Sequence, residues 1–121
     1  MSQKTLVYAF AFLVLSCAAA LAKVPKDMIG NWRWHAFTTE VSECQPGQLC
    51  AKVIAGPKSV GMEIFASKLV VRGDEWQGQI VDPETKQLYH TRFREIDART
   101  WRLSGCTATG VCLSGEFVRI K

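Results

Sequence analysis

The C-terminal part of the chain carries the pattern that most restricts its fold. Alternating residues lead into Cys106, small residues around Thr109-Gly110 follow, and a second run starts at Cys112 and ends near Arg119. Alternation with a period of two indicates a strand, and small turn residues between two such runs indicate a hairpin. The pattern therefore predicts an antiparallel hairpin whose tip is closed by its own disulfide.

The first 22 residues have the composition of a secretory signal peptide. Lys4 gives a positive start, residues 6–15 are apolar, and Ala20-Leu21-Ala22 is an A-x-A cleavage site. The apolar run is shorter than the roughly 20 residues of a membrane span, and no later stretch is apolar enough to span. We therefore expect a signal peptide over 1–22 and an exported domain over 23–121, in the periplasm or secreted.

Cys17 lies inside this leader and offers an alternative to cleavage after Ala22. The residues before it, Leu13-Val14-Leu15-Ser16, loosely fit a bacterial lipobox. On that reading Cys17 carries a lipid anchor and the protein is an outer-membrane lipoprotein.

Four further cysteines form two pairs with C-x5-C spacing, and they are Cys44, Cys50, Cys106 and Cys112. An even number of cysteines in a short exported chain indicates a disulfide framework. Each pair brackets a turn, which favours Cys44–Cys50 and Cys106–Cys112; the crossed pairing that ties the two hairpins together stays open. Structural zinc sites favour C-x2-4-C spacing, so the C-x5-C pairs do not indicate zinc, and the sequence predicts no metal site. No cofactor is predicted either.

Short alternating segments separated by turn residues fill the rest of the chain. The expected strands cover residues 29–36, 49–55, 62–72, 75–81, 87–96 and the two arms of the C-terminal hairpin. Residues 62–72 read either as one bulged strand or as two strands with a bend near Ala66-Ser67, and residues 23–27 read as a mobile lead-in. No helical pattern follows the leader. The prediction is all-β: a single small antiparallel barrel or half-open barrel of six to eight strands.

Several short motifs along the chain resemble one family. These are Gly30-x-Trp32, Leu49-Cys50, Trp76-x-Gly78-x-Ile80-x-Asp82-Pro83, Tyr89, Trp101 through Cys106, Cys112 and Phe117-Val118-Arg119. Together they resemble the small exported bacterial proteins catalogued as domain of unknown function 2147. The resemblance implies a lipocalin-like barrel with no agreed activity. The chain departs from the family at Lys86, where a Gly is usual, at Phe117, where a Trp is usual, and in a short connector over 56–61.

Aromatic residues recur on the predicted inward faces, and they are Trp32, Trp34, Trp76, Tyr89 and Trp101. One interpretation is a pocket for a small apolar or ring-bearing ligand. The other is that these rings are the core, because a barrel of about eight strands is only wide enough to be filled by its own side chains.

The polar positions give fewer functional signals. Arg92, Arg94 and Arg102 fall on outward positions and suit either an anionic lipid, glycan or protein surface or an ordinary solvated face. The formal net charge of +4 is too mild for a nucleic-acid binding surface. His35 and His90 lack the further ligands of a metal site and the nucleophile of a catalytic triad, so no catalytic residue is predicted.

These observations favour a non-enzymatic binding or structural barrel of the cell envelope, with a small apolar ligand or an envelope protein as partner. The alternative is an inhibitor or chaperone-like module that contacts proteins through its two disulfide-stapled hairpin tips. An enzyme is the third reading, and it requires a polar cluster on the inward face.

Overall fold

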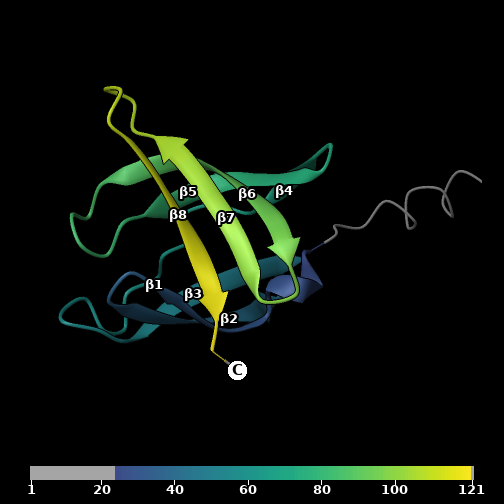
Figure 1. Ribbon diagram of the computed structural model, residues 1–121, viewed down its shortest axis with the longest axis horizontal. Helices are drawn as coiled ribbons and strands as arrows, with labels where there is room; N and C mark the ends of the chain where they lie inside the picture. The colour runs from purple at the N-terminus through teal and green to yellow at the C-terminus, as the bar shows by residue number, and fades with distance from the viewer. Residues whose placement is uncertain (1–23, 121) are drawn as a thin grey trace, which may run out of the picture.

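The computed structural model describes residues 24–120, and the predicted leader with Cys17 lies outside them. Eight strands form one antiparallel sheet in the order β3-β2-β1-β8-β7-β6-β5-β4. They are β1 (Gly30–Trp34), β2 (Phe37–Gln45), β3 (Gln48–Ala55), β4 (Val70–Arg72), β5 (Glu75–Val81), β6 (Leu88–Asp97), β7 (Thr100–Cys106) and β8 (Cys112–Arg119). The sheet curls into a half-open barrel (Figure 1). The prediction of an all-β fold with up to eight antiparallel strands is confirmed.

The N-terminal region differs from the sequence prediction in two ways. The strand expected over 29–36 ends at Trp34, and a turn at His35-Ala36 leads into β2, which the sequence analysis missed. The turn was hidden because apolar alternation continues through it and because His35, not Gly or Asn, takes the positive φ of 55°. The expected lead-in also forms a short 3-10 helix, Lys26–Met28, whose Met28 side chain is buried in the core.

The segment 61–66 joins the two sides of the half-barrel. Its backbone pairs with β3 through hydrogen bonds from Ile64 N to Ala51 O and from Val53 N to Met62 O, at 2.7 and 3.0 Å. On the other side Ala66 N donates to Gln79 O of β5 at 2.8 Å, and Val81 N donates to Ile64 O at 2.8 Å. Residues 62–72 therefore form two isolated bridges and the three-residue strand β4 rather than one long strand or two full strands.

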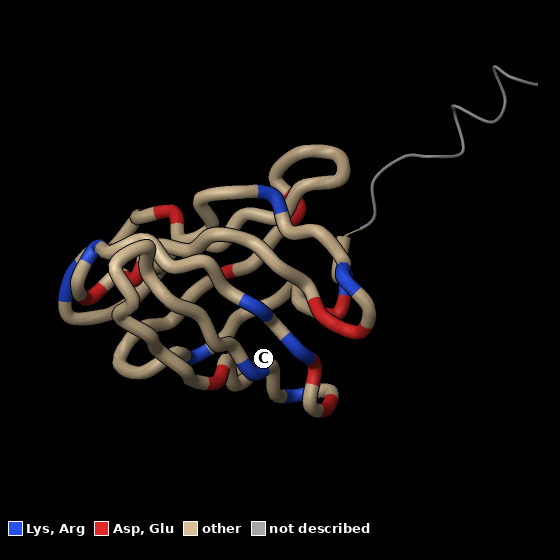
Figure 2. The backbone as a smooth tube through the Cα atoms, turned by 90° about the horizontal axis from the view of Figure 1, so that it is seen from above, with Lys and Arg blue, Asp and Glu red and all other residues tan. Residues whose placement is uncertain are grey.

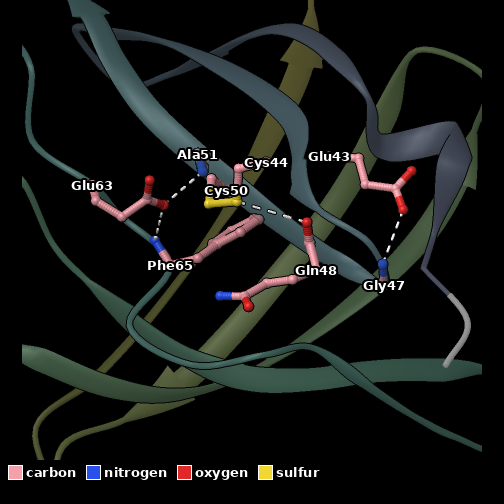
Figure 3. The surroundings of a disulfide bond; sticks show 8 residues. All are labelled: Glu43, Cys44, Gly47, Gln48, Cys50, Ala51, Glu63 and Phe65. Carbon is pink, nitrogen blue, oxygen red and sulfur yellow. Dashed lines mark hydrogen bonds between the residues drawn. A yellow bond between two sulfur atoms is a disulfide. The ribbon is translucent and has the colours of Figure 1, made fainter.

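A carboxylate braces this connection. Glu63 Oε2 accepts hydrogen bonds from Ala51 N of β3 at 2.6 Å and from Phe65 N at 3.1 Å (Figure 3). Hydrogen bonds to a charged acceptor are stronger than neutral ones. Glu63 thus pairs two backbone donors at the place where the regular ladder between strands is interrupted.

Replacing Glu63 with Ala is expected to lower the free energy of unfolding by about 1–2 kcal/mol, because both N–H groups lose a charged acceptor. Urea unfolding followed by tryptophan fluorescence measures the change. Glu40→Ala is the control, since Glu40 borders the same surface hollow and is expected to change stability by less than about 0.5 kcal/mol. Equal effects of the two substitutions would contradict the bracing role.

Both hairpin tips are closed as predicted. Disulfides join Cys44 to Cys50 at the β2–β3 tip and Cys106 to Cys112 at the β7–β8 tip. The local pairing is confirmed, and the crossed pairing is thereby excluded. Figure 1 shows the β7–β8 tip projecting from the body of the molecule.

Candidate functional site

The predicted aromatic residues come together in the interior of the barrel. Trp32, Trp34, Tyr89 and Trp101 are 0–4% exposed and belong to one continuous core cluster, and Trp76 is partly buried against it. Phe93 lies among them, with ring centroids 5.9 Å from Phe65 and 6.1 Å from Phe117. These side chains form the core of the barrel. Trp34 also lines a hollow of about 300 Å³ with His35, Phe37, Asp82 and Glu84. Ligand binding by the five predicted residues stays a prediction.

The indole N–H groups differ in how they are satisfied. Trp32 Nε1 donates to Met28 O at 2.7 Å, and the Arg119 guanidinium lies 4.3 Å from the centre of the Trp32 ring. Within the described residues the buried Nε1 atoms of Trp34 and Trp101 have no hydrogen-bond partner. Trp34 instead packs against Gly115, where a Cβ would lie 3.1 Å from its Nε1. A glycine at 115 therefore makes room for the Trp34 ring.

The interior holds little polar chemistry. The buried polar residues found among the described ones are Thr39 and Thr91. Thr39 Oγ1 donates to Trp32 O at 3.5 Å and Thr91 Oγ1 donates to Tyr89 O at 3.2 Å. Because both hydroxyls are bonded to backbone carbonyls, neither is positioned as a nucleophile or base.

The outer surface of β5–β8 offers a second candidate site, which we call the polar face. It consists of the outward side chains Gln77, Gln79, His90, Arg92, Ser104 and Ser114. The antiparallel register places Gln77, Arg92, Ser104 and Ser114 directly opposite one another across four strands. Opposite residues have Cβ atoms about 4.5–5.5 Å apart, so these donors and acceptors form a continuous row.

A charged row lies beside the polar face. Arg94 and Arg102 are opposite each other on β6 and β7, an arrangement that is unfavourable for like charges. Each arginine is neutralised by a carboxylate on its other side: Arg94 contacts Glu75 at 3.3 Å and Arg102 contacts Glu116 at 3.3 Å. The charges of this row are therefore balanced within the protein.

Arg92 is different from these two arginines. It is exposed, and it makes no ion pair or side-chain hydrogen bond with another residue in the described range 24–120. It borders three adjoining surface hollows; the two larger ones have volumes of about 450 and 460 Å³. Lys68 borders the first hollow and His90 borders both of the larger ones. No carboxylate lines either of these two hollows.

The neighbouring backbone is closely packed at this point. Gly105 is opposite Thr91, and a Cβ at Gly105 would lie 2.2 Å from the His90 carbonyl oxygen. Only glycine fits such an approach without moving the backbone. Gly105 therefore allows β6 and β7 to hold His90 and Arg92 beside Ser104.

The hairpin tips predicted as partner contacts are internally braced. At the β7–β8 tip Thr107 N donates to Val111 O at 2.7 Å, and Val111 N donates to Thr107 Oγ1 at 3.1 Å. At the β2–β3 tip Gly47 N donates to Glu43 Oε2 at 3.0 Å (Figure 3). Both tips are thus ordered by hydrogen bonds in addition to their disulfides.

Sequence reasoning identified Arg92 as outward-facing but missed most of its surroundings. The alternation in β5 was sufficient to place Gln77 and Gln79 on the outer face. Lys68 comes from the irregular connector and has no such signal. Glu95 and Asp97, which follow Arg94 on β6, line neither of the two larger hollows.

Other classes of site receive no support from the described part of the chain. Within residues 24–120 no three His, Cys, Asp or Glu side chains gather as metal ligands. No helix there has the length and hydropathy of a membrane-spanning segment. Figure 2 shows basic and acidic residues interspersed along the backbone. Comparison with family models, with curated proteins and with solved structures finds no match for this chain.

Proposed function

We propose that the protein is an exported, non-enzymatic binding module of the cell envelope, and that its ligand binds on the outside of the barrel. The observation that carries the proposal is the combination of a buried aromatic core with an exposed Arg92 in the polar face that makes no ion pair among residues 24–120. The bonded Thr39 and Thr91 hydroxyls favour binding over catalysis.

Export is supported by the disulfides, which persist in oxidising compartments and are rare in reducing ones. The proposal includes the signal peptide over residues 1–22 and the resemblance to family 2147, with its lipocalin-like barrel. Intact-mass measurement of the protein from the periplasm and medium tests cleavage after Ala22. A mass that retains residues 1–22 would contradict export with processing, and a lipid on Cys17 would identify the lipoprotein alternative.

A direct test of outside binding compares two signals. Purified lipopolysaccharide, peptidoglycan fragments and phospholipid vesicles are titrated into the oxidised protein by calorimetry and by tryptophan fluorescence. The proposal predicts heat of binding with a smaller change in emission than an interior ligand gives, because Trp32, Trp34 and Trp101 are buried and Trp76 is partly buried against the core. A large emission change would favour an interior ligand. Failure to bind any of the envelope components tested would contradict the proposal.

The second candidate is a protein inhibitor or chaperone-like module acting through the hairpin tips. The projection and internal bracing of the β7–β8 tip favour it, because a rigid loop loses little entropy on binding. Replacing residues 107–111 with a Gly-Ser loop of the same length while keeping both cysteines separates the candidates. Loss of partner capture would support the tip, and unchanged capture would favour the polar face.

A further inference from the structure

We propose that Arg92 is the centre of a binding site for a phosphorylated sugar or glycerol group. This inference rests on the proposed function, because it names the ligand class recognised by the same polar face.

The positive charge at Arg92 is available to an external anion. Glu75 lines the third and smallest hollow together with Arg92, but its carboxylate is held by Arg94 at 3.3 Å, and Glu116 is held by Arg102 at 3.3 Å. Lys68, which borders the same hollow as Arg92, also makes no ion pair among the described residues. An anion in this hollow therefore meets two cations whose charge is not already balanced.

The residues around Arg92 suit a phosphate that is attached to a polyol. The planar guanidinium offers two parallel N–H donors to phosphate oxygens, and a lysine ammonium acts as a point charge on the same group. Gln77 and Ser104 are opposite Arg92 in the register, and Gln79 lines the first hollow. Amide and hydroxyl groups both donate and accept hydrogen bonds, as the hydroxyl groups of a sugar or glycerol require.

The outer surface of β2–β3 has the opposite character. Its hollow is bordered by Glu40 and Glu63 with a single cation, Lys52. A phosphate is repelled by the two carboxylates there, so electrostatics direct an anionic ligand to the β5–β8 side. The two halves of one sheet thus differ in the charge that they present.

The test is a titration of oxidised, isotope-labelled protein with glucose 1-phosphate, followed by backbone amide NMR shifts. We expect saturable shifts at Gln77, Arg92 and Ser104, which weaken as added salt screens the charges. Glucose gives no such shifts, because it lacks the anion. Inorganic phosphate binds more weakly than glucose 1-phosphate, and glucuronate tests whether any anionic sugar is sufficient.

Arg92→Gln is expected to weaken glucose 1-phosphate binding about tenfold, which corresponds to about 1.4 kcal/mol. Arg92→Lys keeps the positive charge but lacks the two parallel N–H donors of the guanidinium, so we expect an intermediate loss of affinity. Arg33→Gln is the matched control: Arg33 is an exposed arginine on an outward position of β1, and we expect unchanged binding. Because both arginines are exposed, thermal unfolding of all three variants should match the wild type.

The outcomes separate this inference from the proposed function. Shifts that Arg92→Gln does not reduce, or glucuronate binding as tight as glucose 1-phosphate, would overturn the phosphate site. Envelope binding that glucose 1-phosphate does not compete would also overturn it, while leaving the proposed function intact. Specific glucose 1-phosphate binding by a protein that binds no envelope component would support the site and contradict the proposed function.

Discussion

Replacing both cysteine pairs with serine is expected to lower the free energy of unfolding by about 5 kcal/mol. In the chain-entropy model each closed loop, with its sequence separation of 6, contributes about 2.4 kcal/mol by restricting the unfolded chain. The two pairs close different hairpins, so their contributions are expected to add. The total is comparable with the 5–15 kcal/mol stability of typical domains, and the variant should be partly unfolded at 37 °C.

Urea unfolding of four proteins measures these contributions. They are the oxidised wild type, the double variant Cys44→Ser with Cys50→Ser, the double variant Cys106→Ser with Cys112→Ser, and the variant with all four substitutions. Each single pair should account for about half of the total loss. The wild-type protein in reductant is the control, because reduction breaks both disulfides and leaves every residue unchanged. A combined loss below about 1 kcal/mol would show that the hairpins are held by their ladders alone.

Phe93→Ala is expected to cost about 3–5 kcal/mol, the range measured for truncating a buried aromatic ring. Phe93 is fully buried and lies opposite Trp76 and Leu103 in the sheet. Its ring meets Phe65 edge-on at 5.9 Å, so it links the regular strands to the segment that connects β3 with β5. Its loss leaves a cavity in the middle of the core.

Leu88→Ala is the matched control, because Leu88 lies on the same strand and is 41% exposed. It is expected to change stability by about 0.5 kcal/mol. Thermal and urea unfolding of both variants give the comparison. If Phe93→Ala destabilised no more than Leu88→Ala, the interior would be loosely packed, and the interior-ligand interpretation of the aromatic residues would gain support.

Alternation and turn residues were sufficient to predict five of the strands closely. β3, β5, β6, β7 and β8 match the expected segments within a few residues, because each has a period of two and ends at a recognisable turn. β1 lies within the strand expected at 29–36, but the turn at His35-Ala36 and the strand β2 were missed, because an apolar pattern continues through a turn without glycine. The prediction was incomplete at 62–72, where the backbone pairs with two different strands in succession.

The candidate site was predictable only in part, because the ion-pair partners of its arginines lie on other strands. The outward direction of Arg92 follows from its position in an alternating strand. Its lack of an ion pair does not, because Arg94 and Arg102 have the same alternation and yet are neutralised by Glu75 and Glu116. The partners of these residues lie on other strands, and their proximity depends on the cross-strand register.

The sequence by itself determined the all-β class and the positions of most turns, and it favoured the local cysteine pairing that the structure shows. These features depend on residues that are close in the chain, through side-chain periodicity, turn conformations and short loop closure. Only the tertiary structure decided that β1 pairs with β8, that residues 61–66 join β3 to β5, and that Glu75 and Glu116 pair with Arg94 and Arg102 and not with Arg92. These contacts join residues far apart in sequence, so they are set by how the whole sheet curls around its aromatic core.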